Sequence, residues 1–146
     1  PGAGETRIHS IYVEDSARAF VHVLCRGDCM GQAYNLAGEQ ILTLNEYFES
    51  IARALDRPLV AEHIPVEWFE ANTDFWKGHS RRFDFASAWY RYQSAFDIST
   101  LKATGFDCLT DHDQGVANNV AWLDSRNMIP SSSDDDMEDR IIKTVR

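Results

Sequence analysis

The residues best suited to bind an anionic ligand are two adjacent arginines, Arg81 and Arg82. A guanidinium group offers bidentate hydrogen bonds to phosphate oxygens, so this pair could hold a phosphate. A solvated surface pair is the alternative interpretation. Aromatic residues lie on both sides of the pair, from Phe75 to Tyr92. An aromatic wall with a few polar groups is typical of a small-molecule pocket, and a hydrophobic core remains the other interpretation.

The sulfur and imidazole side chains do not follow a metal-binding pattern. Cys25 and Cys29 form a C-x-x-x-C pair, but neither Cys108 nor a nearby histidine completes a tetrahedral set. The five histidines are scattered along the chain. An odd number of unevenly spaced cysteines fits reduced thiols better than a disulfide framework. We therefore expect no metal site.

The sequence also lacks the glycine-rich motif of a dinucleotide-binding site. Such a site needs a glycine-rich turn that follows a strand and opens a helix, so that the backbone can approach the pyrophosphate. The stretch Gly2-Ala3-Gly4 instead precedes the first predicted strand. The sequence therefore predicts that this chain alone binds neither NAD nor NADP.

The acidic composition argues against nucleic acid as a partner. The 146 residues carry a formal net charge of −9. Binding of nucleic acid depends on phosphate neutralisation by Lys and Arg, so we expect no nucleic-acid partner. No apolar run approaches the ~20 residues that cross a bilayer, and the N-terminus lacks the basic and then apolar pattern of a signal peptide. We expect no membrane partner and a cytoplasmic location.

Short strands that alternate with helices are expected to position these groups, which makes the predicted fold class α/β. Residues 8–13 are rich in β-branched and aromatic side chains and predict a strand. Residues 14–16 then supply acceptors for a helix start, and we interpret Asp15 as a helix cap rather than a catalytic acid. A second short strand is predicted from Ala33 to Ala37. The apolar face of the first helix is formed by Ala17, Phe20, Val21 and Leu24.

The clearest helix begins at Thr43. Thr43 and Glu46 have the spacing of a capping box, and an apolar stripe at the helical period continues to Leu55. A third strand is predicted from Leu59 to Ile64, and Pro65 begins a helix over residues 66–72. Further helices are expected at 97–104 and 110–123. We divide the chain into a connector (1–7), one domain (8–125) and an acidic, mobile tail (126–146), in which 137–145 could form a frayed helix.

Four motifs in a fixed order carry a resemblance. They are I-Y-V-E-D-S-A at 11–17 before a helix, A-Y-N-L-A-G at 33–38 before a helix that begins T-L-N-E, D-I-S-T-L-K at 97–102 with Gly105-Phe106, and a last helix at 116–123 with Trp122. This order resembles the C-terminal part of the extended short-chain dehydrogenase/reductases, the NAD-dependent epimerase/dehydratase family. The family has V-[HY]-V-D-D-x-A, Y-N-[LV]-G-x-G and D-x-S-K-A-x-x-x-L-G-[WF]. The third motif here is one residue shorter, with Thr100 in place of Lys.

The resemblance implies the C-terminal substrate-binding part of a Rossmann-type epimerase, dehydratase or reductase. The parent protein would transfer hydride to and from NAD or NADP, on a nucleotide sugar or another carbonyl/hydroxyl substrate. In that family the Tyr of a Y-x-x-x-K motif transfers the proton, and no tyrosine here has a Lys four residues later. We therefore expect the catalytic and cofactor-binding residues in a missing N-terminal nucleotide-binding portion. This chain would be inactive alone, and its uncovered apolar surface would make it sticky or a homodimer.

Four residues are candidates for substrate binding: Arg7, Tyr12, Arg81 and Arg82. Family members that act on nucleotide sugars place one Arg just before the first strand motif, and here that position falls on Ile8, next to Arg7. A second Arg follows the proline that ends the next strand. Here Pro65 is followed by Val66 and Glu67, which argues against a nucleotide sugar unless the arginine pair replaces the missing charge. For Tyr12, packing within the strand is the alternative to lining the substrate pocket.

Two other functions fit the same residues. Val66 and Glu67 in place of a phosphate-binding Arg, together with the acidic tail, favour a non-catalytic regulator or scaffold that has kept the fold for protein binding. A free-standing small ligand-binding domain would instead be a stable monomer. A Y-x-x-x-K pair in the full-length protein would favour the enzyme, and its absence would favour the regulator.

Overall fold

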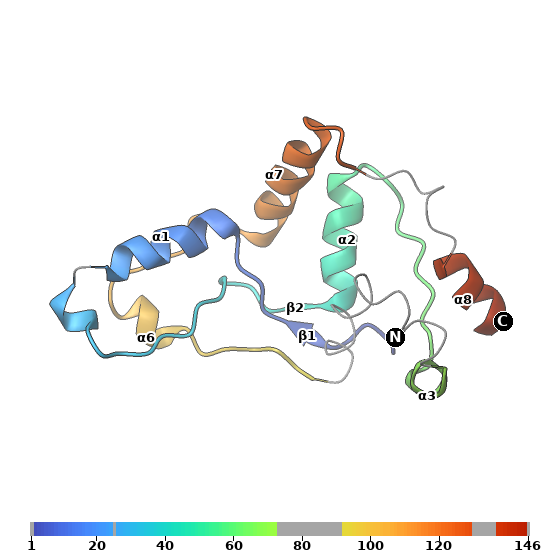
Figure 1. Cartoon of the computed structure of the whole chain (residues 1–146), viewed down its shortest axis with the longest axis horizontal. Helices are drawn as coiled ribbons and strands as arrows, with labels where there is room; N and C mark the ends of the chain where they lie inside the picture. Colours follow the sequence, from blue (N-terminus) through green and yellow to red (C-terminus); the bar gives the residue numbers. More distant parts are fainter. Residues whose placement is uncertain (1, 25, 73–91, 130–136, 146) are drawn as a thin grey trace.

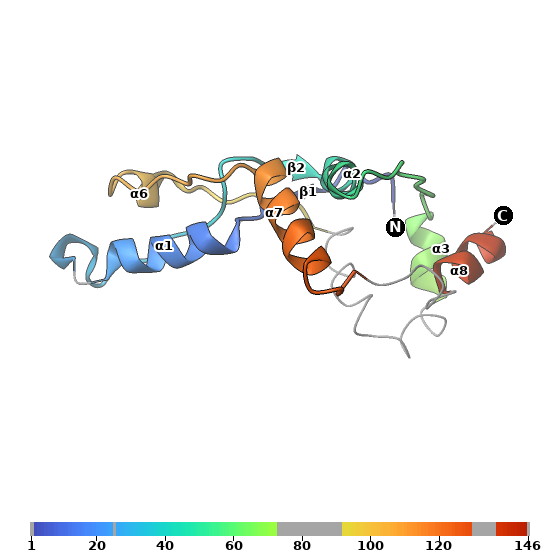
Figure 2. The ribbon, with the colours of Figure 1, turned by 90° about the horizontal axis from the view of Figure 1, so that it is seen from above.

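The fold is elongated, with helices gathered at its two ends and in its middle. A computed structural model of the chain describes residues 2–24, 26–72, 92–129 and 137–145. In both views α1 (Val13–Val23) and α6 (Ser99–Lys102) lie at one end, α3 (Val66–Ala71) and α8 (Met137–Val145) at the other, and α2 (Leu44–Ala54) and α7 (His112–Asp124) between them (Figures 1 and 2).

The sheet is a single antiparallel pair of very short strands. β1 (Arg7–Ile8) pairs with β2 (Leu42–Thr43), so that Arg7 lies opposite Thr43 and Ile8 opposite Leu42. No other strand occurs in the part of the chain that the structure describes. The fold is therefore a mixture of helices and short strands, α/β in the broad sense.

The three strands predicted from composition were wrong in extent or existence. Only Ile8 of the expected strand 8–13 is in β1, and neither Ala33–Ala37 nor Leu59–Ile64 forms a strand. A strand needs a neighbouring strand to pair its backbone N–H and C=O groups, and β-branched composition cannot supply that neighbour. The partner that β1 does find, Leu42–Thr43, had no strand signal of its own.

Helix α1 begins one residue earlier than predicted and without a side-chain cap. Its N-cap is Tyr12, whereas Glu14 and Asp15 lie inside the first turn, where the helix dipole favours their charge. The interpretation of Asp15 as a cap was therefore wrong. Its carboxylate is only 1% exposed and accepts hydrogen bonds from the backbone N–H groups of Leu109 (3.1 Å) and Thr110 (2.9 Å) and from Arg18 (2.6 Å).

Helices α2 and α7 form the middle of the molecule and pack side by side (Figure 1). The predicted capping box is confirmed, because the Thr43 hydroxyl accepts from the backbone N–H of Glu46 while the Glu46 carboxylate accepts from that of Thr43. At α7 the Asp111 side chain accepts from the backbone N–H of Gln114 (2.8 Å). Gly115 lets Tyr12 approach, since a Cβ there would lie 3.1 Å from the Tyr12 ring.

Among the described residues, a small hydrophobic cluster lies at each end of the molecule. Ala19 of α1 packs with Leu101 and Phe106, which fixes α6 beside α1. At the other end Phe69 of α3 packs with Ile141 of α8. The α3 helix begins after Pro65 as predicted, and the helix left open for residues 137–145 is present as α8. No helix among the described residues is long and apolar enough to cross a membrane.

Candidate functional site

The candidate site is a cavity of about 110 Å³ at the N-terminal end of α7. Three segments far apart in the sequence meet there: residues 10–12 before α1, residues 38–40, and Thr110–His112 at the start of α7. Tyr47 of α2 closes one side. The lining residues that carry hydroxyl, imidazole, amide or carboxylate groups are Ser10, Tyr12, Glu39, Gln40, Tyr47, Thr110, Asp111, His112 and Asn119.

Backbone contacts fix the position of Ser10 at this cavity. The N–H of Gly38 donates to the Ser10 carbonyl (2.9 Å), and a Cβ at Gly38 would lie only 2.6 Å from that oxygen. The neighbouring His9 bonds the Gly38 carbonyl through Nε2 (2.7 Å), while its Nδ1 accepts from the backbone N–H of Phe96 (3.0 Å). The chain before α1 is thus held against residue 38 without a β-ladder.

His112 links α7 to α2 and to the segment before α1 through its two ring nitrogens. Nε2 lies 2.8 Å from the hydroxyl of Ser50 in α2, and Nδ1 lies 3.3 Å from the hydroxyl of Ser10. The Tyr47 ring packs against the imidazole, with 5.3 Å between the ring centroids. Burial lowers the pKa of His112, and Arg53 acts in the same direction, against the carboxylates of Asp113 and Asp111. Burial also raises the pKa of Tyr47.

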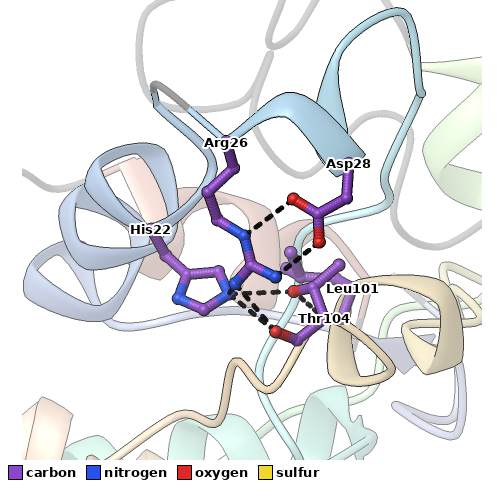
Figure 3. Close-up of polar contacts among 5 residues, drawn as sticks. All are labelled: His22, Arg26, Asp28, Leu101 and Thr104. Carbon is purple, nitrogen blue, oxygen red and sulfur yellow. Dashed lines mark hydrogen bonds and ion pairs between the residues drawn. The ribbon is translucent and has the colours of Figure 1, made fainter.

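A second polar cluster ties the end of α1 to the turn after α6 (Figure 3). Arg26 makes two bonds to the Asp28 carboxylate (3.1 and 2.6 Å) and a third to the Thr104 carbonyl (2.9 Å). His22 Nε2 lies 2.9 Å from the Thr104 hydroxyl, which itself donates to the Leu101 carbonyl (2.6 Å). Hydrogen bonding to Arg26 lowers the pKa of Asp28. Because Arg26 is committed to these partners, the cluster serves as a clamp between elements.

Of the four predicted substrate-binding residues, the structure describes Arg7 and Tyr12, and only Tyr12 lines the cavity. Arg7 is exposed in β1 and is not one of the lining residues, and its backbone N–H donates to the Gln93 side chain (2.8 Å). Arg81 and Arg82, like most of the aromatic stretch around them, lie outside the described residues. A role in substrate binding stays a prediction for all four. Asn35 does bond a backbone group as expected, since its amide donates to the Asp97 carbonyl (2.9 Å).

Sequence reasoning missed Ser10, Ser50 and His112. Ser10 and His112 are 102 positions apart and Ser50 and His112 are 62 apart, so no local motif links them. The sequence predicted a helix that begins at Thr110, and this prediction places His112 in the first turn. It does not predict which side chains contact His112.

The groups at the cavity can donate and accept hydrogen bonds and move a proton, which is what hydroxyl and imidazole groups do in catalytic and binding sites. Within the described ranges no group of three or more His, Cys, Asp or Glu side chains could hold a metal ion. Comparisons of the chain with protein-family models, with curated proteins and with solved structures find no match.

Proposed function

We propose that this chain is the substrate-binding C-terminal portion of an NAD(P)-dependent epimerase/dehydratase/reductase-like protein. Its substrate would be a nucleotide sugar or another molecule with a carbonyl or hydroxyl group at the reacting carbon. The nucleotide-binding portion, with the cofactor and the Tyr–Lys pair, would pack on helix α1. One observation carries the proposal: α1 is apolar on two sides, and only one side is covered.

The uncovered side is a continuous stripe, here called the α1 stripe and defined as Val13, Phe20, Val21 and Leu24. These side chains follow the helical spacing i, i+7, i+8, i+11 and are 64–71% exposed. The covered side holds Ala19 and Val23, which pack in the cluster with Leu101 and Phe106. A helix with apolar residues on two sides is typical of an element that lies between two layers.

A hollow beside the stripe offers a place for a partner's side chains. It has a volume of about 410 Å³ and is lined by Ala17, Arg18, Val21, His22 and Phe106. Residues 33–37 are a second place where another layer could pack. This largely apolar segment has no strand partner among the described residues. A segment without a strand partner suits the edge of a sheet. The parallel sheet of a nucleotide-binding portion would supply both a layer for α1 and a neighbour for this segment.

The first test is to read the coding sequence upstream of Pro1. We expect it to encode a strand, a glycine-rich turn that opens a helix, and later Y-x-x-x-K. The longer protein should then bind NAD or NADP, measured by the fluorescence of the reduced nicotinamide. A coding sequence with neither motif would overturn the enzymatic proposal.

The α1 stripe also predicts self-association of this chain. We expect sedimentation velocity to show concentration-dependent dimers, and Phe20→Glu with Val21→Glu to weaken the association at least about tenfold, because burial of each apolar side chain contributes about 1.5–3 kcal/mol. Val60→Glu is the matched control, since Val60 is 87% exposed and lies outside the stripe. A wild-type chain that stays monomeric at every concentration would contradict the prediction and favour the free-standing domain.

A protein-binding regulator remains the second candidate, and one contact favours it. Val66, which stands where nucleotide-sugar enzymes of the resembled family carry a phosphate-binding Arg, is half-buried and packs on the Phe69–Ile141 cluster. The side chain at position 66 therefore packs in a hydrophobic cluster in this chain and does not bind a phosphate. The coding sequence separates the two candidates, because a regulator does not need the Tyr–Lys pair.

A further inference from the structure

We propose that Ser10 and His112 form a nucleophile–base pair that accepts an acyl group from small activated esters. This activity needs neither nicotinamide nor a second polypeptide, and so it does not rest on the function proposed above. Both side chains line the cavity at the N-terminal end of α7.

The hydrogen bonds around His112 determine which nitrogen carries the proton. The Ser50 hydroxyl donates its only proton to the Tyr47 carbonyl (2.7 Å), so towards His112 it can only accept. With the Ser50 proton on that carbonyl, we assign the hydrogen to Nε2, which lies 2.8 Å from the hydroxyl and donates to it. In the neutral imidazole Nδ1 is then unprotonated, and its lone pair faces the Ser10 hydroxyl at 3.3 Å.

This arrangement is the one that general-base activation of a serine requires. The base is neutral, its lone pair is directed at the hydroxyl, and its far nitrogen is held by a third group. A separation of 3.3 Å is longer than the ideal, as such contacts often are before a substrate is bound. Ser50 is buried and both Ser10 and His112 are half-buried, so the pair is shielded on the protein side and open on the cavity side.

The charged groups around His112 leave the imidazole neutral. Asp113 on the same helix is paired with Arg53 of α2 (2.8 Å), and Asp111 is engaged by the N–H of Gln114. Ser10 and Ser50 carry no charge, and Glu39 at the cavity is paired with Lys102 (2.7 Å). Because each nearby carboxylate has a partner, the effect of burial on the pKa of His112 outweighs the effect of Asp113 and Asp111. The pKa is lowered, and the neutral imidazole is present at neutral pH.

The cavity has room for a short acyl group. Its volume of about 110 Å³ is a few times the ~30 Å³ share of one water molecule. In the first step Ser10 Oγ bonds the carbonyl carbon of the ester, and the serine proton passes to His112 Nδ1. The bond from that carbon to the leaving oxygen breaks, and the leaving alcohol takes the proton. Water then attacks the acyl-serine, gives a proton to Nδ1 and releases the acid, while Ser10 regains its proton.

Ser50 is a positioning residue in this scheme. Without its hydroxyl, Nε2–H has no acceptor, and the other tautomer, which turns a proton towards Ser10, becomes accessible. We expect Ser50→Ala to lower the plateau of the pH–rate profile roughly 3- to 10-fold, the value of one hydrogen bond. Ser50→Thr, which keeps a hydroxyl, should restore the rate. A purely structural Ser50 would leave the plateau unchanged in folded protein.

The test uses the whole chain and p-nitrophenyl acetate. We expect a burst of p-nitrophenolate and, by mass spectrometry, one acetyl group on Ser10. Ser10→Ala should lose both, and His112→Gln should slow acetylation at least about 100-fold. The rate should fall as the pH drops through a pKa below the usual ~6.5 of histidine, since protonation removes the base. Ser125→Ala is the matched control, because Ser125 lies on the surface near the end of α7 and bonds the Trp122 carbonyl.

Three results would overturn the proposal. One is the absence of acetyl from Ser10 in wild-type protein whose circular dichroism shows it folded. Another is acetylation of other side chains with an unchanged burst in Ser10→Ala. The third is an unchanged rate in folded His112→Gln. If His112→Gln does not fold, Ser10→Cys decides the question: a thiol in the same place should be acetylated faster than the native cysteines Cys25, Cys29 and Cys108, and equal or slower labelling counts against the site.

Discussion

Asp15→Ala is expected to lower the free energy of unfolding by about 3 kcal/mol, the largest effect of any polar substitution among the residues described above. The Asp15 carboxylate is 1% exposed and accepts from two backbone N–H groups and from Arg18. Hydrogen bonds to a charged group contribute about 1.5–3 kcal/mol, and alanine would remove the acceptor of the backbone N–H groups of Leu109, which is exposed, and Thr110, which is half-buried. Urea unfolding followed by circular dichroism measures the change.

Glu14→Ala is the matched control for this substitution. Glu14 and Asp15 lie in the same first turn of α1, so both substitutions remove one negative charge from the same end of the helix dipole. Glu14 is exposed, and its loss should cost at most about 1 kcal/mol. Equal effects of the two substitutions would show that Asp15 acts through the dipole and not through its link to residues 109–110.

The contribution of Asp15 should also depend on pH. Burial alone would raise the pKa of this carboxyl, but the bonds from Leu109, Thr110 and Arg18 outweigh burial and lower it. Because the folded pKa lies below the unfolded one, the stabilisation is complete above the unfolded pKa and is lost as the pH falls through the folded pKa. The difference in stability between wild type and Asp15→Ala, measured by urea unfolding, should therefore shrink towards pH 2. A constant difference from pH 7 to pH 2 would contradict this account.

The elements that sequence predicted well are those whose signals are local. Thr43 and Glu46 cap α2 with each other, three positions apart, and Pro65 precedes α3 because a proline fits where a helix needs no N–H donor. The strand predictions were wrong because strand formation is not local. The segment Ala33–Ala37 has the composition of a strand, but whether it pairs depends on a second segment elsewhere in the sequence.

The site was hidden from the sequence because its contacts are long-range. Asp15 reaches residues 94 and 95 positions away, and Ser10 reaches His112 over 102. Neither spacing forms a motif, an Asp near a helix start is more readily interpreted as a cap, and Ser10 lies within the predicted strand 8–13. The periodicity of α1 did identify the apolar face of Ala17, Val21 and Leu24, but no sequence pattern says whether such a face is covered. In the structure it is exposed, and the proposal that another layer packs on α1 rests on that exposure.

At the far end of the molecule, Phe69→Ala is expected to release α8 from α3. Phe69 is 2% exposed and packs on Ile141, and removing a buried phenylalanine typically costs about 3–5 kcal/mol. The cluster around Phe69 does not include the residues that pack around Ala19, Leu101 and Phe106, so the loss should stay local. A nine-residue helix is not stable in water without packing, hence α8 should unfold on its own.

Amide hydrogen exchange separates local from global loss after Phe69→Ala. Protection should fall by at least about 100-fold in residues 139–145 and remain within a few-fold of wild type in α2, because the two regions open independently. Phe48→Ala is the matched control: Phe48 is 49% exposed on α2, and the same truncation there should change stability by less than about 1 kcal/mol. Equal loss of protection in α2 and α8 would mean that the two clusters unfold as one unit. In that case the α3–α8 pair would belong to the same cooperative core as the cavity at α7, and the acidic tail could not be removed without disturbing Ser10 and His112.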